Sequence, residues 1–544
     1  MNQSDNNNLN CRGLLKTGYD IITHICFKYH IGVKAKILIG SFIIVLPALV
    51  QYFLFDEPEY LISFILCFSL TLSVFLLTRA SLVLTLPFAV ISFIYTFFLV
   101  VYRKSLGATS IMALMNTQVD VMFNFTVSPM MITASLVFIT AFIMYVRFVL
   151  LKGKNDHREE LIPEGKSYIP ITVTIVATCF FIFGYAYVIK AYPFSLSRDS
   201  TTYVKIVSAM KKKAEESYKF EGTLCKGYKE SKNTFVLIVG ESSRRASWSL
   251  YGYERKTNLF LKHEIDEHPD EFIIFKNYIA TAQTTYPSLM TIFSPVLSRD
   301  FIHIPQCPSF VGILNNLDYE TYFVSTYGNI FMNFINARQH IIIKSADDNE
   351  LVPVLKKILD DKSNSKKLIV LHLRGSHCGM SEYKYTYSGY ISPSANPVMD
   401  KYDNTILQTD MFLKNVAELV IGENDPVCVW YMPDHGENLN DSNDKNFTHG
   451  CSGFTRYEIE LPSVMFYNKS FMDGNPGIKA VNANKNTLVS HSNVAHTVMG
   501  LCGAYPKEYL SRYDVSSENF RRDEPYLVDV DLFPIRYSRA EIKR

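Results

Sequence analysis

FVLIVGESS (235–243) runs from five consecutive apolar residues through a glycine into a short polar turn. An uninterrupted apolar run of this length is typical of a strand that is buried on both faces of a sheet. Similar runs recur later in the chain, separated by stretches with helical patterning: 272–280, 321–326, 367–374, 427–432 and 462–468. Strands that alternate with helices in this way predict a doubly wound α/β domain from residue 233 onward.

Residues suited to metal binding follow three of these runs. Glu241 follows the first run, and Pro-Asp-His-Gly-Glu (433–437) follows the run at 427–432. Gly-Ser-His (375–377) lies beyond the run at 367–374. Taken singly, such residues are often a helix-capping carboxylate or an ordinary turn. Because ligands of open α/β sheets bind at the carboxyl ends of the strands, their shared position instead favours one metal site, suited to zinc with manganese possible.

A hydroxyl for the same site is expected from the segment TAQTTYPSLM (281–290), which opens a helix after the second run. The N-terminus of a helix presents free N–H groups and a positive dipole to a phosphate. Thr284 and Thr285 are the candidates, and N-capping is the alternative explanation for either one. A threonine hydroxyl is a poor nucleophile at neutral pH, and coordination to a divalent cation is one way to activate it.

The first third of the chain is predicted to lie in a membrane. A helix needs about 20 apolar residues to cross the hydrocarbon core of a bilayer, and five segments meet this requirement. They are 37–55, 60–78, 81–101, 130–150 and 168–190. Soluble helices are rarely apolar on all sides for so long, which argues against buried helices of a soluble protein.

The distribution of basic residues predicts the orientation of these segments. Lys34, Lys36 and Arg79 mark ends that the positive-inside rule places in the cytoplasm, as do the basic residues at 147–158; the pair at 103–104 is an exception. Five crossings that start inside end outside. The sequence therefore predicts an uncleaved inner-membrane anchor and an extracytoplasmic C-terminal domain.

These patterns predict three parts of the chain: a transmembrane domain (1–190), a linker (191–232) and an extracytoplasmic catalytic domain (233–544). Residues 105–129 form an outward loop that is too polar to span a bilayer, and their apolar rhythm suits a helix at the membrane surface.

Charge and cysteine content limit the partners and the compartment. The chain has 54 Lys and Arg against 52 Asp and Glu, so it has no global basic field for nucleic acid. Disulfides can persist outside the cytoplasm, but the six cysteines after the last apolar segment allow many pairings and none is assigned. These cysteines are Cys225, Cys307, Cys378, Cys428, Cys451 and Cys502.

Seven ordered blocks resemble the phosphoethanolamine transferases of the sulfatase/alkaline-phosphatase superfamily. The blocks are FVLIVGESSRRASWSLYGYERKTN (235–258), TTYPSL (284–289), LHLRGSH (371–377), KYDNTILQTDMFL (401–413), YMPDHGEN (431–438), FTHG (447–450) and HSNVAHTVMGLCG (491–503). The family modifies lipid A, lipopolysaccharide core or other envelope glycans and includes polymyxin-resistance enzymes. The resemblance implies five membrane helices followed by a sulfatase-like α/β domain with a mixed, largely parallel sheet.

Residue by residue, the resemblance implies a zinc ion held by Glu241, Asp434, His435 and Thr285. Thr285 matches the family's nucleophile, which carries phosphoethanolamine as a covalent intermediate, because it lies ten residues after the Phe of the Phe-Lys-Asn segment (275–277).

Other positions match the family less fully. His377 and His449 match two histidines beside the zinc that contact the phosphate or a second metal. Asn116 and Asp120 are counterparts of the family's donor-lipid contacts, although the spacing is imperfect. The loop around Thr285 lacks the cysteines that often flank the nucleophile, and Ser-His-Cys-Gly (376–379) replaces the usual Ser-His-Gly-Pro.

The resemblance thus implies zinc-dependent transfer of phosphoethanolamine from phosphatidylethanolamine to lipopolysaccharide core or lipid A, on the periplasmic side of the inner membrane. The alternatives are a membrane-anchored phosphodiesterase or a glycerol-phosphate transferase with the same site, and a scaffold that binds lipid through a decayed site. The sequence does not identify the acceptor.

Overall fold

The computed structural model describes most of the chain in separate stretches. These are residues 33–55, 58–78, 85–102, 107–116, 129–150, 191–216, 218–229, 231–327, 332–345, 347–377, 396–439, 441, 449–450 and 453–543. They group into two compact units. One comprises Met1–Leu106 and Val127–Arg198, and the other comprises Gly107–Thr126 and Asp199–Arg544.

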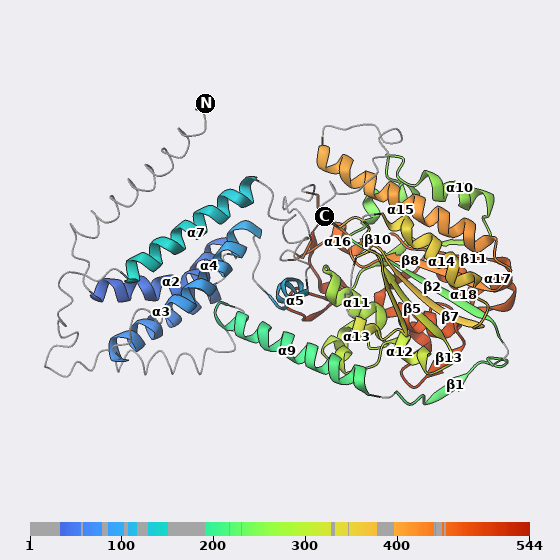
Figure 1. Cartoon of the computed structure of the whole chain (residues 1–544), viewed down its shortest axis with the longest axis horizontal. Helices are drawn as coiled ribbons and strands as arrows, with labels where there is room; N and C mark the ends of the chain where they lie inside the picture. The colour runs from blue at the N-terminus through green and yellow to red at the C-terminus, as the bar shows by residue number, and fades with distance from the viewer. Residues whose placement is uncertain are drawn as a thin grey trace, which may run out of the picture. The chain divides into compact units, whose positions relative to one another are not determined.

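A seven-stranded sheet organises the second unit, with the strand order β3-β11-β8-β2-β7-β5-β6 (Figure 1). The strands are β2 (Asn233–Gly240), β3 (Phe272–Ile274), β5 (Glu320–Ser325), β6 (Gln339–Ile342), β7 (Lys366–His372), β8 (Val427–Pro433) and β11 (Val464–Tyr467). Only β11 runs antiparallel to its neighbours β3 and β8. The predicted mixed, largely parallel sheet is therefore confirmed.

Helices cover both faces of this sheet, as the apolar character of its strands requires. On β2, Phe235, Leu237 and Val239 pack into one core with helices α11, α12, α18 and α19, whereas Val236 and Ile238 pack into a second core with α10, α14 and α15. The helices are α10 (Leu259–Glu267), α11 (Thr285–Phe293), α12 (Phe310–Asn315), α14 (Leu351–Asp360), α15 (Pro397–Ile421), α18 (Gly477–Asn484) and α19 (Val494–Leu501). Successive side chains of a strand point to opposite faces, so both sets are buried.

Two details of the sheet differ from the sequence prediction. The apolar run 272–280 is divided, because β3 joins the large sheet while β4 (Asn277–Ile279) joins a three-stranded sheet with β10 (Glu460–Leu461) and β12 (Leu488–Ser490). The edge strand β6 was not predicted, since its sequence QHII is short and only partly buried.

Smaller elements complete the second unit. The helices are α13 (Met332–Ile335), α16 (Arg456–Ile459) and α17 (Lys469–Gly474), and the paired strands are β1 (Gly222–Leu224), β9 (Phe454–Thr455), β13 (Ala504–Pro506), β14 (Tyr526–Val528), β15 (Pro534–Arg536) and β16 (Ile542–Lys543). The predicted linker 191–232 contains helix α9 (Phe194–Glu215) and strand β1, which pairs with β13.

The first unit contains long apolar helices at four of the five predicted membrane segments: α2 (Val33–Phe55), α3 (Pro58–Thr78), α4 (Thr85–Tyr102) and α7 (Pro129–Leu150). Within the described stretches, Ile37–Phe55 is the one helix long and apolar enough to cross a membrane, with a mean hydropathy of 2.3. The predicted segment 168–190 lies outside the described residues. The number of crossings stays a prediction.

Helix α5 (Ala108–Asn116) falls in the predicted outward loop, yet it folds as part of the second unit. Ala108 and Met112 are buried in the core that contains α11. The backbone N–H and the hydroxyl of Thr109 both donate to the carbonyl of Val530, at 3.4 and 3.0 Å. This helix therefore packs beside α11.

Candidate active site

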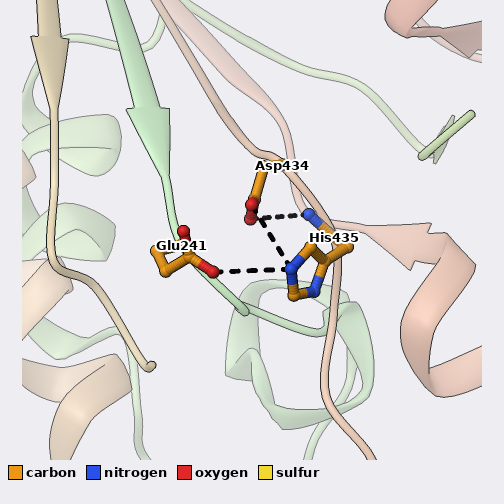
Figure 2. Close-up of side chains that lie close together, drawn as sticks. All are labelled: Glu241, Asp434 and His435. Atoms are coloured by element: carbon orange, nitrogen blue, oxygen red, sulfur yellow. Dashed lines mark hydrogen bonds and ion pairs between the residues drawn. The ribbon is translucent and has the colours of Figure 1, made fainter. Parts of the chain in front are cut away.

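Three buried ligand-type side chains meet where the central strands end (Figure 2). Glu241 follows β2, and Asp434 and His435 follow β8; these strands are neighbours, with Gly240 opposite Pro433. His435 Nε2 lies 3.4 Å from Glu241 Oε1 and 3.3 Å from Asp434 Oδ2. One ligand atom from each residue fits within a 4.8 Å span. The predicted convergence of these residues is thus present in the fold.

The backbone around Glu241 is held in an unusual conformation. Ser242 has a φ of 55°, in the left-handed region that non-glycine residues rarely adopt. The Ser242 N–H donates to Asp434 Oδ1 at 3.1 Å, and its hydroxyl donates to Glu241 Oε1 at 3.0 Å. Local strain of this kind is stored at functional sites, where surrounding contacts enforce it. Here it turns Glu241 toward the end of β8.

Gly375 supports Glu241 from the other side. Its φ is 55°, and a Cβ added there would lie 2.7 Å from both the backbone N and O of Glu241. The next N–H, that of Ser376, donates to the Glu241 carbonyl at 2.8 Å. Glycine is required at this position because both the conformation and the close approach exclude a side chain.

The chemistry of these residues fits a cation. Glu241 Oε2 and Asp434 Oδ2 are buried and accept no hydrogen bond within the described part of the chain. Burial, with the nearby charge of Asp434, raises the pKa of Glu241 well above its ordinary value. Two buried carboxylates side by side need a positive charge. Burial also lowers the pKa of His435, which keeps its imidazole neutral, the form that binds metals.

His435 is oriented by its own neighbour. Its Nδ1 lies 2.8 Å from the carbonyl of Gly436, which accepts a hydrogen bond from it. The lone pair is therefore on Nε2, the atom that faces Glu241 and Asp434. A histidine held this way by a backbone carbonyl is typical of metal ligands. Glu241, Asp434 and His435 are consequently the residues that would hold zinc.

Thr285 supplies the hydroxyl beside this set. Its Oγ1 lies 3.2 Å from Glu241 Oε1 and 3.2 Å from His435 Nε2. It is the first residue of α11, so the N-terminus of that helix lies at the site. Thr284 is the residue before the helix; its side chain makes no capping hydrogen bond. Of the two threonines predicted as candidates, Thr285 is the one that contacts Glu241 and His435.

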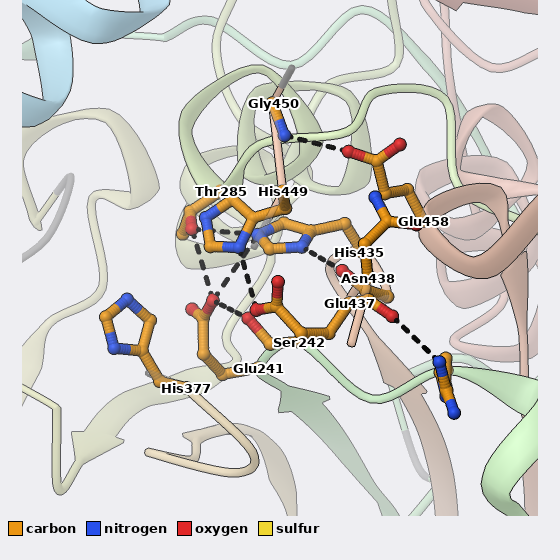
Figure 3. Close-up of polar contacts among 12 residues, drawn as sticks. Glu241, Ser242, Thr285, His377, His435, Glu437, Asn438, His449, Gly450 and Glu458 are labelled. Atoms are coloured by element: carbon orange, nitrogen blue, oxygen red, sulfur yellow. Dashed lines mark hydrogen bonds and ion pairs between the residues drawn. The ribbon is translucent and has the colours of Figure 1, made fainter. Parts of the chain in front are cut away.

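Two further histidines line the same edge (Figure 3). The ring of His449 lies 4.1 Å from that of His435 and 6.2 Å from that of His377, measured between centroids. His377 and His449 are the two histidines that the family resemblance predicts beside the zinc. His449 Nδ1 lies 3.0 Å from Glu437 Oε2, and His377 Nε2 lies 2.9 Å from the hydroxyl of Tyr327.

Sequence reasoning missed Glu437 and Tyr327 as partners of these histidines. Glu437 stands inside the Pro-Asp-His-Gly-Glu motif, and Tyr327 closely follows the strand run 321–326. The same strand-end rule that identified Glu241 could have found both. A third missed residue, Glu458, accepts the backbone N–H of Gly450 at 2.8 Å and so fixes the chain next to His449.

Other predicted residues lie elsewhere. Asn116 is the last residue of α5, and Asp120 lies outside the described residues, so donor-lipid binding by either stays a prediction. The cysteines Cys225, Cys307, Cys428 and Cys502 are free thiols, whereas Cys378 and Cys451 lie outside the described residues.

The chain is similar to known proteins over the residues that carry this site. Residues 233–504, which are 272 of the 544 residues, match the family model described as Sulfatase. Phosphoethanolamine transferase EptA of Helicobacter pylori is 24% identical over 289 residues, which are 49% of this chain and 53% of that protein. Phosphoethanolamine transferase EptC of Escherichia coli is 24% identical over 344 residues, 55% of this chain and 58% of that protein. The chain spans about half the length of the curated relatives it matches.

Solved structures share the fold. The integral membrane lipooligosaccharide phosphoethanolamine transferase A (EptA) of Neisseria meningitidis aligns with a TM-score of 0.68 and 18% identity, over 89% of this chain and 98% of that one. The C-terminal periplasmic domain of EcEptC from Escherichia coli, in a complex with Zn, aligns with a TM-score of 0.53 and 20% identity, over 59% of this chain and 96% of that one. With the ligand set at the strand ends and the match over residues 233–504, the chain belongs to the sulfatase family.

Proposed function

We propose that this chain is a zinc-dependent phosphoethanolamine transferase that uses Thr285 as its nucleophile. The observation that carries the proposal is the position of Thr285 Oγ1, 3.2 Å from both Glu241 Oε1 and His435 Nε2 at the N-terminus of α11. A carboxylate, an Asp-His pair and a hydroxyl are a donor set suited to zinc. The names of the matched relatives support the same reaction class.

In the first half of the reaction, the Thr285 oxygen attacks the phosphorus of phosphatidylethanolamine. The hydroxyl donates its hydrogen bond to Glu241 Oε1, so a carboxylate is placed to accept the proton. The new bond joins Thr285 to phosphorus, and the bond to the diacylglycerol oxygen breaks. When bound, zinc supplies Lewis-acid activation and positive charge at this position.

His449 is placed to give a proton to the departing alkoxide. Its Nδ1 lies 3.0 Å from Glu437 Oε2, and its ring lies 4.1 Å from that of His435, which places an imidazole beside the reacting group. In the second half, an oxygen of the acceptor attacks the same phosphorus: the bond from that oxygen to phosphorus forms and the bond to Thr285 Oγ1 breaks. His449 takes the proton of the acceptor, and Glu241 returns its proton to Thr285. The N–H groups at the start of α11 stabilise negative charge on the phosphoryl oxygens in both halves.

The proposal includes the setting of the reaction. Five apolar segments (37–55, 60–78, 81–101, 130–150 and 168–190) anchor the chain in the inner membrane, and residues 233–544 form the catalytic domain in the periplasm. Phosphatidylethanolamine is the donor, and the acceptor is lipid A or lipopolysaccharide core. The name of one relative, Kdo(2)-lipid A phosphoethanolamine 7''-transferase of Escherichia coli, which is 23% identical over 301 residues, supports lipid A as the acceptor.

Mass spectrometry of the Thr285 peptide tests the nucleophile. The purified full chain is incubated with phosphatidylethanolamine alone, and the peptide should gain a phosphoethanolamine group. The Thr285→Ala variant should show no modified peptide and no transfer, whereas Thr284→Ala should retain both because its side chain makes no capping hydrogen bond. Modification at another residue, or transfer by Thr285→Ala, contradicts the proposal. Free ethanolamine phosphate as the main product would instead favour a phosphodiesterase.

A further inference from the structure

A cavity of about 340 Å³ lies in the second unit, apart from Glu241, Asp434 and His435. Its walls come from β12, the β14–β15 hairpin and three short 3-10 helices: η4 (Ser298–Gln306), η7 (His491–Asn493) and η8 (Ser511–Tyr513). Glu241, Thr285, Asp434 and His435 do not line it. The volume is within the range of roughly 300–1,000 Å³ that is common for small-molecule sites.

Four arginines from four different segments line this cavity: Arg299, Arg512, Arg521 and Arg536. The acidic residues of the lining are Asp523 and Glu524. Arg299 is itself paired with Asp300, just outside the lining, at 3.0 Å, so four guanidinium groups stand against three carboxylates and leave an excess of one positive charge. The four arginines are exposed, so water screens their mutual repulsion, and the excess charge favours an anion as the ligand.

The two carboxylates are already occupied. Asp523 pairs with Arg512 at 3.4 Å. Glu524 accepts the backbone N–H of Ser538 at 2.7 Å, and hydrogen bonding to Ser538 lowers the pKa of Glu524. Arg521 forms no ion pair with any residue that the structure describes. Its guanidinium is exposed, so its donors are open to water or to a ligand.

Aromatic rings fix two of the other guanidinium groups. Arg512 lies over the ring of Tyr513 at 5.1 Å, and Arg536 lies over the ring of Tyr526 at 5.9 Å. Arg536 Nε also donates to the Tyr526 hydroxyl at 2.9 Å. Stacking of this kind orders the planar fork of arginine, which matches the oxygens of phosphate and carboxylate.

The cavity has hydroxyls as well as charge. Ser298 and Ser492 both line it, and their hydroxyls lie 3.1 Å apart. Ser490 and Asn493 add further polar groups. Together with arginines, these groups suit a ligand that has both an oxyanion and several hydroxyls, such as a sugar phosphate or a sugar acid.

One wall of the cavity is continuous with the candidate active site. His491 stands between the lining residues Ser490 and Ser492, and its Nε2 lies 3.1 Å from the carbonyl of Pro433, the residue before Asp434. On β14, the N–H of Val528 donates to the carbonyl of Thr281 at 2.6 Å, four residues before Thr285. The cavity is therefore built on the same segments that position both the ligand set and the nucleophile.

We propose that this cavity binds the phosphate or carboxylate of a sugar in the acceptor glycan, as a site separate from the one where phosphoethanolamine is transferred. The identity of the ligand as an acceptor rests on the proposed function. The shared chemistry is an oxyanion on a polyhydroxylated ring, and the two sources are a phosphorylated sugar and a sugar acid.

Calorimetry on the zinc-loaded full chain tests this site with three probes: glucosamine 1-phosphate, glucuronate and glucosamine. At least one anionic probe should bind, and glucosamine should not. The Arg521→Gln/Arg536→Gln variant should bind the anionic probe at least about tenfold more weakly, because hydrogen bonds to charged groups are lost. The Arg522→Gln/Arg539→Gln variant removes the same charge outside the lining and should bind normally.

The tighter anionic probe identifies the source, either phosphorylated sugar or sugar acid. Equal binding by both double variants, or no binding of either anion, overturns the proposal. If the double variant does not fold, Arg521→Gln alone decides, since Arg521 has no ion pair to lose within the described residues. Mass spectrometry of the Thr285 peptide from the same preparation separates the two proposals. If the Thr285 peptide is unmodified and an anion binds through the arginines, only the proposed transferase reaction is contradicted. If the peptide is modified and no anion binds, only the proposed role of the cavity is contradicted.

Discussion

Glu437 Oε2 lies 3.0 Å from Nδ1 of His449, and the ring of His449 lies 4.1 Å from that of His435. The carboxylate thereby fixes the orientation of the imidazole next to the ligand set. Glu437 acts through His449, so we regard it as a positioning residue.

We expect Glu437→Gln to reduce the rate of transfer about 10–100-fold, the usual effect of losing an orienting partner of this kind. The variant keeps the shape of the side chain and removes its charge. Zinc content should stay at the level of the parent protein, because Glu437 is outside the Glu241, Asp434 and His435 set. Glu418→Gln, on the exposed part of α15, is the control. Parent-level activity in Glu437→Gln would show that His449 needs no orientation.

Chelation should destabilise the catalytic unit. A metal that binds only the folded state stabilises it, by about 2.7 kcal/mol at a free concentration 100 times its Kd. The chain's two tryptophans, Trp248 and Trp430, are buried in this unit, so their fluorescence reports its unfolding. The unfolding temperature should fall on chelation and recover with zinc. In Asp434→Asn this response should be absent, whereas the exposed substitution Asp360→Asn should retain it.

We expect Gly375→Ala to lower the free energy of unfolding by more than the conformational cost of alanine alone. Gly375 and Gly252 both have positive φ, 55° and 95°, so alanine costs about 1 kcal/mol at either position. At Gly375 a Cβ would also meet the backbone of Glu241 at 2.7 Å, while at Gly252 nothing lies within 4 Å. Denaturant unfolding should therefore show a larger loss for Gly375→Ala than for Gly252→Ala, together with reduced zinc binding. Equal losses would mean that the backbone moves freely there.

The buried carboxyl of Asp410 should make the stability of the protein depend on pH. Its carboxylate accepts the N–H groups of Phe260 and Leu261 at 2.8 and 3.1 Å, and burial raises its pKa to about 7 from 3.8. Between these two values the folded state binds more protons than the unfolded state. The unfolding free energy contributed by this group consequently falls as pH rises from about 4 to about 7, and is constant above that range.

Substituting Asp410 should test this sign. In Asp410→Asn the decline in unfolding free energy between about pH 4 and pH 7 should become shallower, because the group no longer titrates. Tryptophan fluorescence in urea at several pH values measures the slope. The control Asp360→Asn, on the exposed end of α14, should keep the parent slope. An unchanged slope in Asp410→Asn would show that other buried carboxyls dominate.

The sequence predicts those parts of the fold and of the site that follow from a local pattern of residues. Glu241 and Asp434 were predictable because apolar runs mark parallel strands and ligands gather at their ends. The residues that the rule alone left ambiguous were Thr284 and Thr285, since both precede the same helix. The family register selected Thr285, and its 3.2 Å contacts with Glu241 and His435 agree.

The features that could not be predicted depend on tertiary contacts, which no local sequence pattern marks. The run 272–280 reads as one strand, but Phe275 and Lys276 pass the chain from one sheet to another, and no local pattern marks that change. Tyr327 contacts His377 across 50 residues of sequence. His372 and His496 are both buried, and burial lowers the pKa of His372 to about 4 and that of His496 to about 3, which a local sequence pattern does not reveal.

Helix α5 lies in the sequence between two segments of the first unit, but it folds with the second unit. Ala108 and Met112 are 1% and 2% exposed within the catalytic core, although they are encoded between apolar segments of the other unit. A fragment that starts at Asp199 would lack these side chains and expose the apolar surface that they cover beside α11. A single recombination break point could therefore not transfer this catalytic unit intact to a new anchor, so the two units are expected to be inherited together.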